Sequence, residues 1–206
     1  EGFGCENLKA GVRAAGALIF YVRETQKQTV EHVTHIETYS LKNHLVCDTL
    51  SYQNLEIEKN LRTGSGRGTL LEVIDKTVTA MGGRLLRQWI RCPLIHKNKI
   101  IERHLAVEES KHQIHVIRKI RDTLKHVYDV ERLRAKISMG QSNARDLLSL
   151  KYSLQALPDI KNLLSSFSSV LFEMKFDTVP LHHLAARIEK AIREDAPPTI
   201  NEGGII

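Results

Sequence analysis

The chain has 206 residues, of which 42% are hydrophobic and 26% are charged, and its formal net charge is +6. These values are ordinary for a globular protein, and a chain this long buries roughly 70% of its unfolded surface, so folding requires no disulfide or metal. The longest apolar run, residues 14–22, is about half a membrane span. It does not resemble a signal peptide, because Glu1 and Glu6 precede it.

The cysteines and the basic charge indicate an ordinary intracellular protein. Cys5, Cys47 and Cys92 are far apart and form no C-x-x-C motif, so we expect a reducing compartment, idle thiols and no zinc site. Lys and Arg number 30 against 24 Asp and Glu, and the excess is spread along the chain. A solvated mixed surface and a surface that follows phosphates both remain open.

The first third of the chain changes from a helical pattern to an extended one. Apolar residues from Leu8 to Val22 recur at intervals of three and four, which predicts a helix over residues 8–26. From Thr29 to Ile57 the pattern becomes β-branched, at Val30, Val33 and Ile36 and then at Leu45-Val46-Cys47. This predicts an extended crossover with one or two short strands.

A glycine-rich turn then leads into the helical part of the chain. A strand-like end at Leu55 and Ile57 precedes Gly64, Gly66 and Gly68. Thr69 and Glu72 have the spacing of a capping box, so a helix should begin there. A P-loop reading is disfavoured, because the glycines alternate and no lysine follows them to neutralise phosphates.

The next helix should begin near Thr79 and end at Pro93. One side carries Leu85, Leu86, Trp89 and Ile90, and we expect Trp89 to be buried. The opposite side carries Arg84, Arg87 and Arg91, a candidate face for contact with phosphates or with neighbouring domains. The alternative is an exposed face whose cationic end complements the helix dipole.

Beyond Thr69 the chain should be helical almost to Asp195. The expected landmarks are a helix cap at Asn98, a separate helix from Val130 to Ile137, a break at Gly140, a restart at Asn143, a helix end at Pro158, and a last helix from Leu181 to Ile192. Single apolar stripes of this kind predict a mainly α helical bundle, in which each helix buries one face.

Histidines and serines suggest no reaction centre. His32, His35 and His44 lie in the crossover, and His182 and His183 lie in the last helix, without the i, i+4 spacing that a zinc site on a helix needs. No G-x-S-x-G motif marks a nucleophile. We therefore expect no catalytic, cofactor-binding or metal-binding residue in this chain.

The order of parts from Asn54 to Leu94 resembles the entry to the core, or lever, domain of the MutS family of DNA mismatch-repair ATPases. Residues 129–160 resemble the next two helices of that domain. Residues 2–7 and the helix that follows them resemble the end of the connector domain. Residues 197–206 resemble the chain just before the long arms of the DNA clamp. The sequence departs from the family at His96 and Lys97 and at His104, which affects local capping and surface charge.

The resemblance implies a division into 1–28, the end of a connector-like domain, and 29–206, a core or lever domain that stops before the clamp arms. Within the latter, 29–62 would be the crossover and 63–206 the bundle. It also implies a parent protein that recognises mispaired double-stranded DNA, binds ATP and magnesium, forms a homodimer or heterodimer, signals to a MutL-type partner and works in the cytoplasm at the nucleoid. Mismatch reading and ATP hydrolysis would belong to other domains, and this segment would couple them.

Two other functions remain open on the sequence alone. A free-standing helical module that binds nucleic acid would show tight, salt-sensitive binding by the isolated chain. A helical scaffold for protein interaction would expose an apolar patch larger than about 600 Å².

Overall fold

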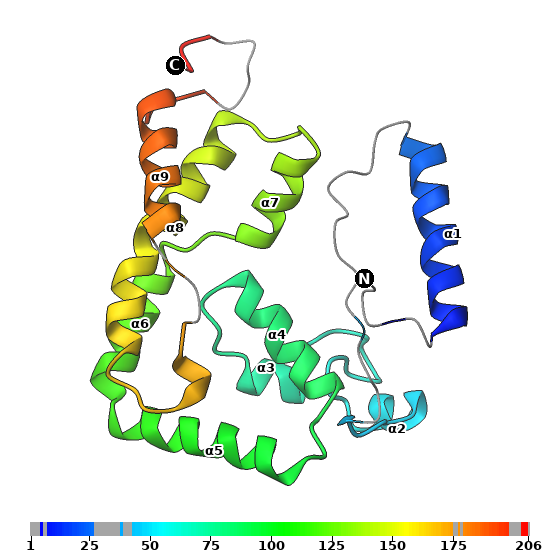
Figure 1. The fold of residues 1–206 in the computed structure, drawn as a ribbon. Helices are drawn as coiled ribbons and strands as arrows, with labels where there is room; N and C mark the ends of the chain where they lie inside the picture. Colours follow the sequence, from blue (N-terminus) through cyan, green and yellow to red (C-terminus); the bar gives the residue numbers. More distant parts are fainter. Residues whose placement is uncertain are drawn as a thin grey trace. The chain divides into compact units, whose positions relative to one another are not determined.

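The computed structural model describes residues 5, 8–26, 38, 43–174, 177, 179–197 and 203–205. Contacts divide the chain into two compact units, Glu1–Lys42 and Asn43–Ile206. In the first unit the described part is essentially one helix, α1 (Lys9–Gln26), where the apolar stripe predicts it (Figure 1). The predicted division at residue 28 stays a prediction, and the predicted strand positions Val30, Val33 and Ile36 lie outside the described residues.

The second unit is built from helices. In chain order they are α2 (Thr49–Asn54), α3 (Leu70–Ile74), α4 (Ala80–Arg91), α5 (Lys97–His112), α6 (Ile114–Leu124), α7 (Val130–Ser138), α8 (Ala144–Leu164), the 3-10 turn η2 (Val170–Phe172) and α9 (Val179–Ala191). The only β pairing in the described part of the chain is an isolated antiparallel bridge between His44 and Leu94. The predicted mainly α fold is confirmed.

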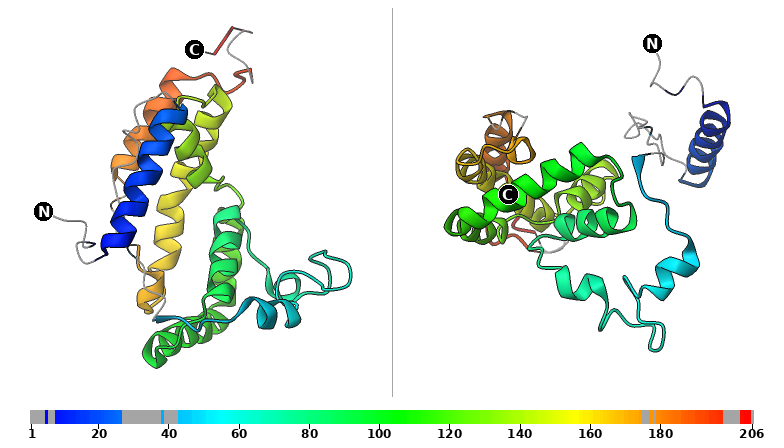
Figure 2. Two further views of the ribbon diagram at one scale, coloured as in Figure 1. Left: turned by 90° about the vertical axis from the view of Figure 1, so that its right-hand side faces the viewer. Right: turned by 90° about the horizontal axis from the view of Figure 1, so that it is seen from below.

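Helix α8 is the centre of this unit. It packs against α6, α7 and α9, and the left view of Figure 2 shows it running along the bundle. Near its C-terminal end, Phe167 packs with Val116 and Ile120 of α6. Near its N-terminal end, Ala144 and Leu148 pack with Ala196, which follows α9. The apolar core therefore lies along both ends of one long helix.

The start of α8 agrees with the sequence, but its end does not. The side chain of Asn143 accepts a hydrogen bond from the amide of Asp146 (2.8 Å), and the Asp146 carboxylate accepts one from the amide of Asn143 (3.1 Å), which is a complete capping box. The prediction that Pro158 ends the helix is wrong, because α8 continues to Leu164. Proline removes one backbone hydrogen bond, and burial of Leu154 and Ile160 on either side keeps the helix intact.

Two further predictions about local structure are wrong. Residues before Leu55 form α2, not a strand, because the carboxylate of Asp48 caps a helix by accepting from the amide of Ser51 (2.9 Å). Helix α5 begins at Lys97, so Asn98 lies inside it and is not its cap. The amide of Ile100 already donates to the carbonyl of His96 (3.1 Å), so the N-cap is His96, two residues before the predicted one.

The side of α4 that carries Trp89 is only partly covered. Trp89 is 39% exposed and Leu85 is also exposed, so the prediction that Trp89 is buried is wrong. The guanidinium of Arg103 on α5 lies 3.6 Å from the centre of the indole ring, a cation–π contact. A long charged side chain thus covers the ring in place of an apolar neighbour.

Candidate functional site

Helix α4 fixes the positions of the three predicted arginines. Its N-cap is Thr79, as predicted, and the hydroxyl of Thr79 accepts a hydrogen bond from the amide of Gly82 (3.1 Å). Gly83 is buried, and a Cβ atom there would lie 3.3 Å from the hydroxyl of Thr77. The first turn is therefore closely packed, which fixes the direction of the helix that carries the arginines.

Arg84 joins α4 to the start of α7. Its two terminal nitrogens donate to the two carboxylate oxygens of Asp129 (2.8 and 2.6 Å), and its Nε donates to Glu131 (2.9 Å). Asp129 is also the N-cap of α7, where it accepts from the amide of Arg132 (3.3 Å). The guanidinium holds the pKa of Asp129 below its usual range, so this carboxylate is charged at neutral pH.

Arg91 forms a second ion pair between separate elements, at the other end of α4. Its Nε and a terminal nitrogen donate to the two oxygens of Glu58 (2.7 and 2.5 Å). Hydrogen bonding to Arg91 lowers the pKa of Glu58, and burial raises the pKa of the nearby Tyr52 hydroxyl. Residues on opposite sides of the glycine-rich turn are therefore joined by a forked ion pair.

Arg87 differs from its two neighbours. Its side chain is exposed, and among the described residues it makes no ion pair. It lies at a shallow pocket of about 470 Å³, whose lining residues are Glu58, Lys59, Gly66, Thr69, Leu71, Glu72, Asp75, Arg87 and Arg91. Of the predicted contact face, Arg84 and Arg91 hold the domain's own elements together, and Arg87 shares its pocket with the carboxylates of Glu58 and Asp75. Contact with phosphates or other domains stays a prediction.

Several backbone amides of the glycine-rich turn donate to side chains of the turn and of the helix that follows it. Side-chain oxygens within the turn accept from the amides of Arg62, Thr63, Ser65 and Arg67. The Glu72 carboxylate accepts from the amide of Gly68 (2.5 Å), and the Thr69 hydroxyl accepts from the amide of Glu72 (3.3 Å). The predicted pair of Thr69 and Glu72 is therefore present, but the Glu72 carboxylate accepts from the amide of Gly68 and not from that of Thr69. These amides are therefore not directed at a ligand, as those of a phosphate-binding loop are.

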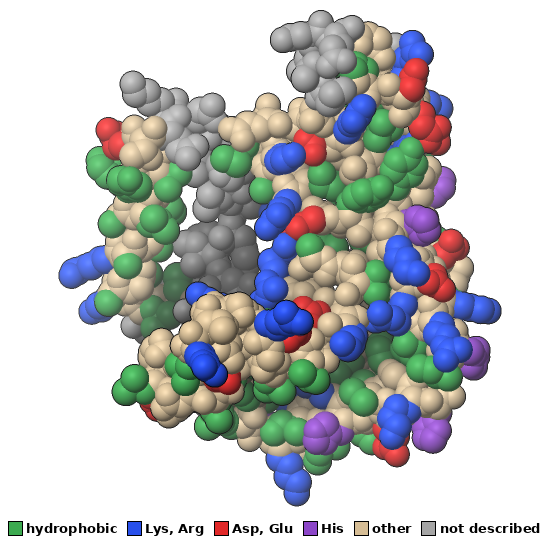
Figure 3. All heavy atoms as spheres, turned by 180° about the vertical axis from the view of Figure 1, so that it is seen from behind, with side chains coloured by type: hydrophobic (Ala, Val, Ile, Leu, Met, Phe, Trp, Pro, Cys, Tyr) green, Lys and Arg blue, Asp and Glu red, His purple; other side chains and the backbone are tan. Residues whose placement is uncertain are grey.

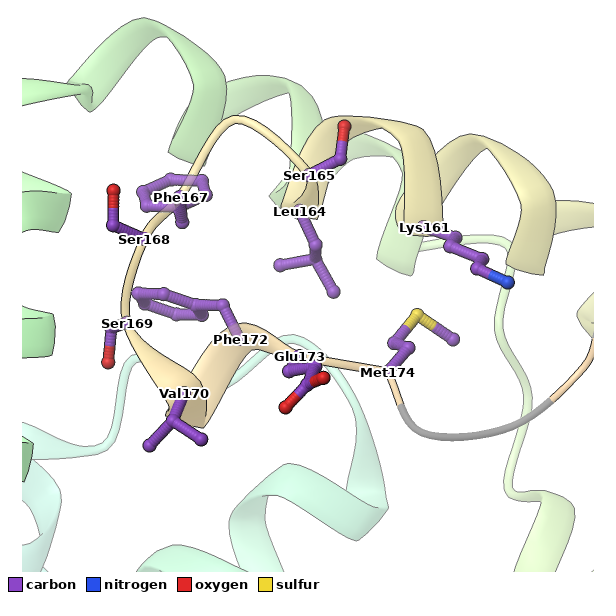
Figure 4. A pocket seen from close by; sticks show the side chains of 10 residues that line it. All are labelled: Lys161, Leu164, Ser165, Phe167, Ser168, Ser169, Val170, Phe172, Glu173 and Met174. Carbon is purple, nitrogen blue, oxygen red and sulfur yellow. The ribbon is translucent and has the colours of Figure 1, made fainter.

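A second cavity lies between the last turn of α8 and η2 (Figure 4). Its volume is about 470 Å³, and Leu164, Phe167, Phe172 and Met174 give it an apolar floor, with Lys161 at the edge. The rings of Phe167 and Phe172 lie 4.5 Å apart. The polar residues of its lining are Lys161, Ser165, Ser168, Ser169 and Glu173.

Metal-binding groups are not assembled in the part of the chain that the structure describes. No three His, Cys, Asp or Glu side chains lie close enough there to hold a metal ion. His32 and His35 lie outside the described residues, and the ring of His96 hydrogen-bonds with the Asn43 side chain (3.0 Å). Of the described helices, none is both long and apolar enough to cross a membrane.

The acidic partners of the arginines were not predicted from the sequence. Asp129 and Glu131 are separated from Arg84 by about 45 residues, so no local spacing connects them. The signal that could have suggested them is the acidic start of α7, since a cap carboxylate offers a second oxygen to a cation. Lys151, which is buried on α8, was also missed.

The fold and its ion pairs define a helical structural domain, in which charged side chains tie separate helices together. The family described as MutS domain III matches residues 51–206. The whole chain is 43% identical to the DNA mismatch repair protein MutS of Halothermothrix orenii and 47% identical to that of Desulforapulum autotrophicum, and it covers 23% and 24% of their lengths. The chain belongs to the MutS family of DNA mismatch repair proteins, within which it corresponds to domain III.

Proposed function

We propose that this domain is the lever of a longer mismatch-repair protein and transmits movement between its DNA-binding end and its ATPase end. The observation that carries this proposal is the continuous helix α8, which extends over 21 residues, or about 30 Å. It contacts α6, α7 and α9 along its length. A helix braced on several sides moves as a unit, which is the requirement for carrying a displacement between distant sites.

The chain spans about a quarter of the length of the relatives it matches, so the activities of the whole protein are also proposals. We propose that the parent polypeptide binds ATP and magnesium through another domain. It would recognise mispaired double-stranded DNA as a homodimer or heterodimer in the cytoplasm, close to the nucleoid, and engage a MutL-type partner. The relatives' name, DNA mismatch repair protein MutS, supports the role in mismatch repair, and the other parts of the proposal rest on the family resemblance. A free-standing module is disfavoured by the same match to short parts of long proteins.

The ion pair between Arg84 and the start of α7 offers a test of the lever role. In the parent polypeptide, Arg84→Gln would loosen α4 from α7, because the Arg84 guanidinium is engaged by Asp129 and Glu131 of the same domain. Stimulation of ATP turnover by a mismatched duplex should then fall by about fivefold, the lower end of typical coupling between sites. The affinities for ATP and for the mismatched duplex, measured separately, should change little.

Arg193→Gln is the matched control. Arg193 also forms a forked pair with a carboxylate, but its partner Asp195 is only two residues away, so the pair joins no separate elements. This variant should leave stimulation unchanged. If Arg84→Gln and Arg193→Gln behave alike, or if Arg84→Gln weakens ligand binding itself, the domain does not act as a lever in the way proposed.

A further inference from the structure

The corner between α5 and α6 carries a cluster of basic side chains. Between Lys111 and Arg121 the sequence contains no acidic residue, and the basic residues there are Lys111, His112, His115, Arg118, Lys119 and Arg121. All six are exposed. Arg121 donates to the carbonyl of Lys76 (2.7 Å), so it is directed toward the loop before α4. We call Lys111, His112, His115, Arg118 and Lys119 the corner cluster.

The packing of α6 directs the corner cluster toward solvent. Val116 and Ile120 are buried against Phe167, at the C-terminal end of α8. Because side chains on a helix follow each other at about 100° per residue, His115, Arg118 and Lys119 lie away from that buried face. Figure 3 shows Lys, Arg and His side chains along one edge of the molecule, with Asp and Glu side chains among them.

Carboxylates lie near the corner cluster on both helices, but none forms an ion pair with Lys111, Arg118 or Lys119 within the described residues. The carboxylate of Glu109 accepts from the amides of Ser168 (2.6 Å) and Ser169 (3.0 Å), so it is directed at the loop after α8. Asp122 pairs with Lys125 (2.7 Å). Glu108 is a neighbour of Lys111 on the surface of α5 and forms no ion pair with it, and Asp159 lies at a separate pocket beside His126.

This arrangement contrasts with that of the arginines on α4. Arg84 and Arg91 each make a forked ion pair within the domain. Lys111, Arg118 and Lys119 make no ion pair within the described residues. Their charge is therefore available to a ligand, whereas most of the charge on the α4 face is already matched.

We propose that the corner cluster is a docking surface for the phosphodiester backbone of double-stranded DNA. Clustered Lys and Arg side chains attract phosphates without reading sequence, and their contribution falls steeply with salt. An acidic protein partner would need apolar anchors at the centre of its interface, and between residues 111 and 121 the only exposed large hydrophobic side chain is that of Ile114. The assignment goes beyond the lever role and does not depend on it.

The test measures binding of this chain to a short fluorescein-labelled DNA duplex by fluorescence anisotropy, between about 50 and 200 mM salt. The triple variant Lys111→Gln/Arg118→Gln/Lys119→Gln should bind more weakly at every salt concentration. If each side chain contacts one phosphate, the slope of log K against log salt should become shallower by about 2.7. Circular dichroism should be unchanged, because the three side chains are exposed.

Lys59→Gln/Arg62→Gln/Arg67→Gln is the matched control, since it removes three exposed cations from the glycine-rich turn and changes the net charge equally. Its salt slope should stay close to that of the unmodified chain. Equal effects of the two variants would show that binding follows net charge alone and would overturn the assignment. Displacement of the duplex by polyglutamate as effectively as by unlabelled DNA would assign the surface to an acidic protein and overturn it as well.

Discussion

The buried lysine on α8 offers a test of what holds α9 in place. Lys151 is only 3% exposed, and its Nζ lies 3.7 Å from carboxylate oxygens of both Glu189 and Glu194. The same nitrogen lies 4.5 Å from the centre of the Tyr152 ring. Both glutamates are largely exposed, at 57% and 75%. We infer that the buried carbon stem of Lys151, more than its charge, stabilises the contact between α8 and α9.

Two substitutions separate the stem from the charge. Lys151→Ala removes three methylene groups, worth about 0.8 kcal/mol each when buried, so unfolding should become easier by about 2 kcal/mol. Lys151→Met keeps most of the volume and leaves no buried charge unpaired, because the glutamates are hydrated. Its cost should be below about 1 kcal/mol, as for other swaps that conserve volume.

Urea denaturation of both variants, followed by circular dichroism, measures the two free energies. Lys151→Arg is a useful control, since it keeps the charge but changes the shape of the head group. If Lys151→Met loses as much stability as Lys151→Ala, the ion pairs carry the contact and the reasoning is refuted. A larger loss for Met than for Ala would have the same consequence.

Three further outcomes are expected. Trp89→Ala should cost about 1–2 kcal/mol in a urea melt, below the 3–5 kcal/mol typical of a fully buried aromatic, and a loss above about 3 kcal/mol would mean that the ring is more covered than the structure shows. The free energy of unfolding should fall on acidification below about pH 4. Folding lowers the pKa of carboxylates such as Asp129, which therefore stabilise the folded state only while they are ionised. In melts between about pH 3 and 6, the free energy of unfolding of Arg84→Gln should fall less steeply. In competition anisotropy, matched and G·T-mismatched duplexes should bind this chain equally, and a tenfold preference, about 1.4 kcal/mol, would show that the domain itself reads the mismatch.

The sequence predicted helices well wherever the signal was local. The cap at Thr79, the restart at Asn143 and the separate helix from Val130 follow from side chains that bond within one turn. The end of α8 was not predictable in this way. Whether Pro158 ends a helix or is tolerated within it depends on the burial of residues such as Leu154 and Ile160, which only the packed bundle determines.

The sequence predicted where the three arginines lie, but not which of them form ion pairs within the domain. The spacing of Arg84, Arg87 and Arg91 places them on one helix face, and they lie together on α4. Their partners come from Glu58 and Asp129, which are far away in sequence, so the charge that remains for a ligand could not be judged beforehand. The exposure of Trp89 was missed for the same reason, since an apolar stripe indicates a side to be covered without naming what covers it.

Pro158 gives α8 a defined point of weakness in bending. The carbonyl oxygen of Leu154 lacks the amide donor that any other residue at position 158 would supply. One i→i−4 backbone hydrogen bond is therefore missing near the C-terminal third of α8. Force applied to the two ends of α8 would concentrate curvature there, while the segments on either side stay straight. The contacts of α8 with α6, α7 and α9 oppose such bending, and any curvature that α8 does take up should be centred on this missing hydrogen bond.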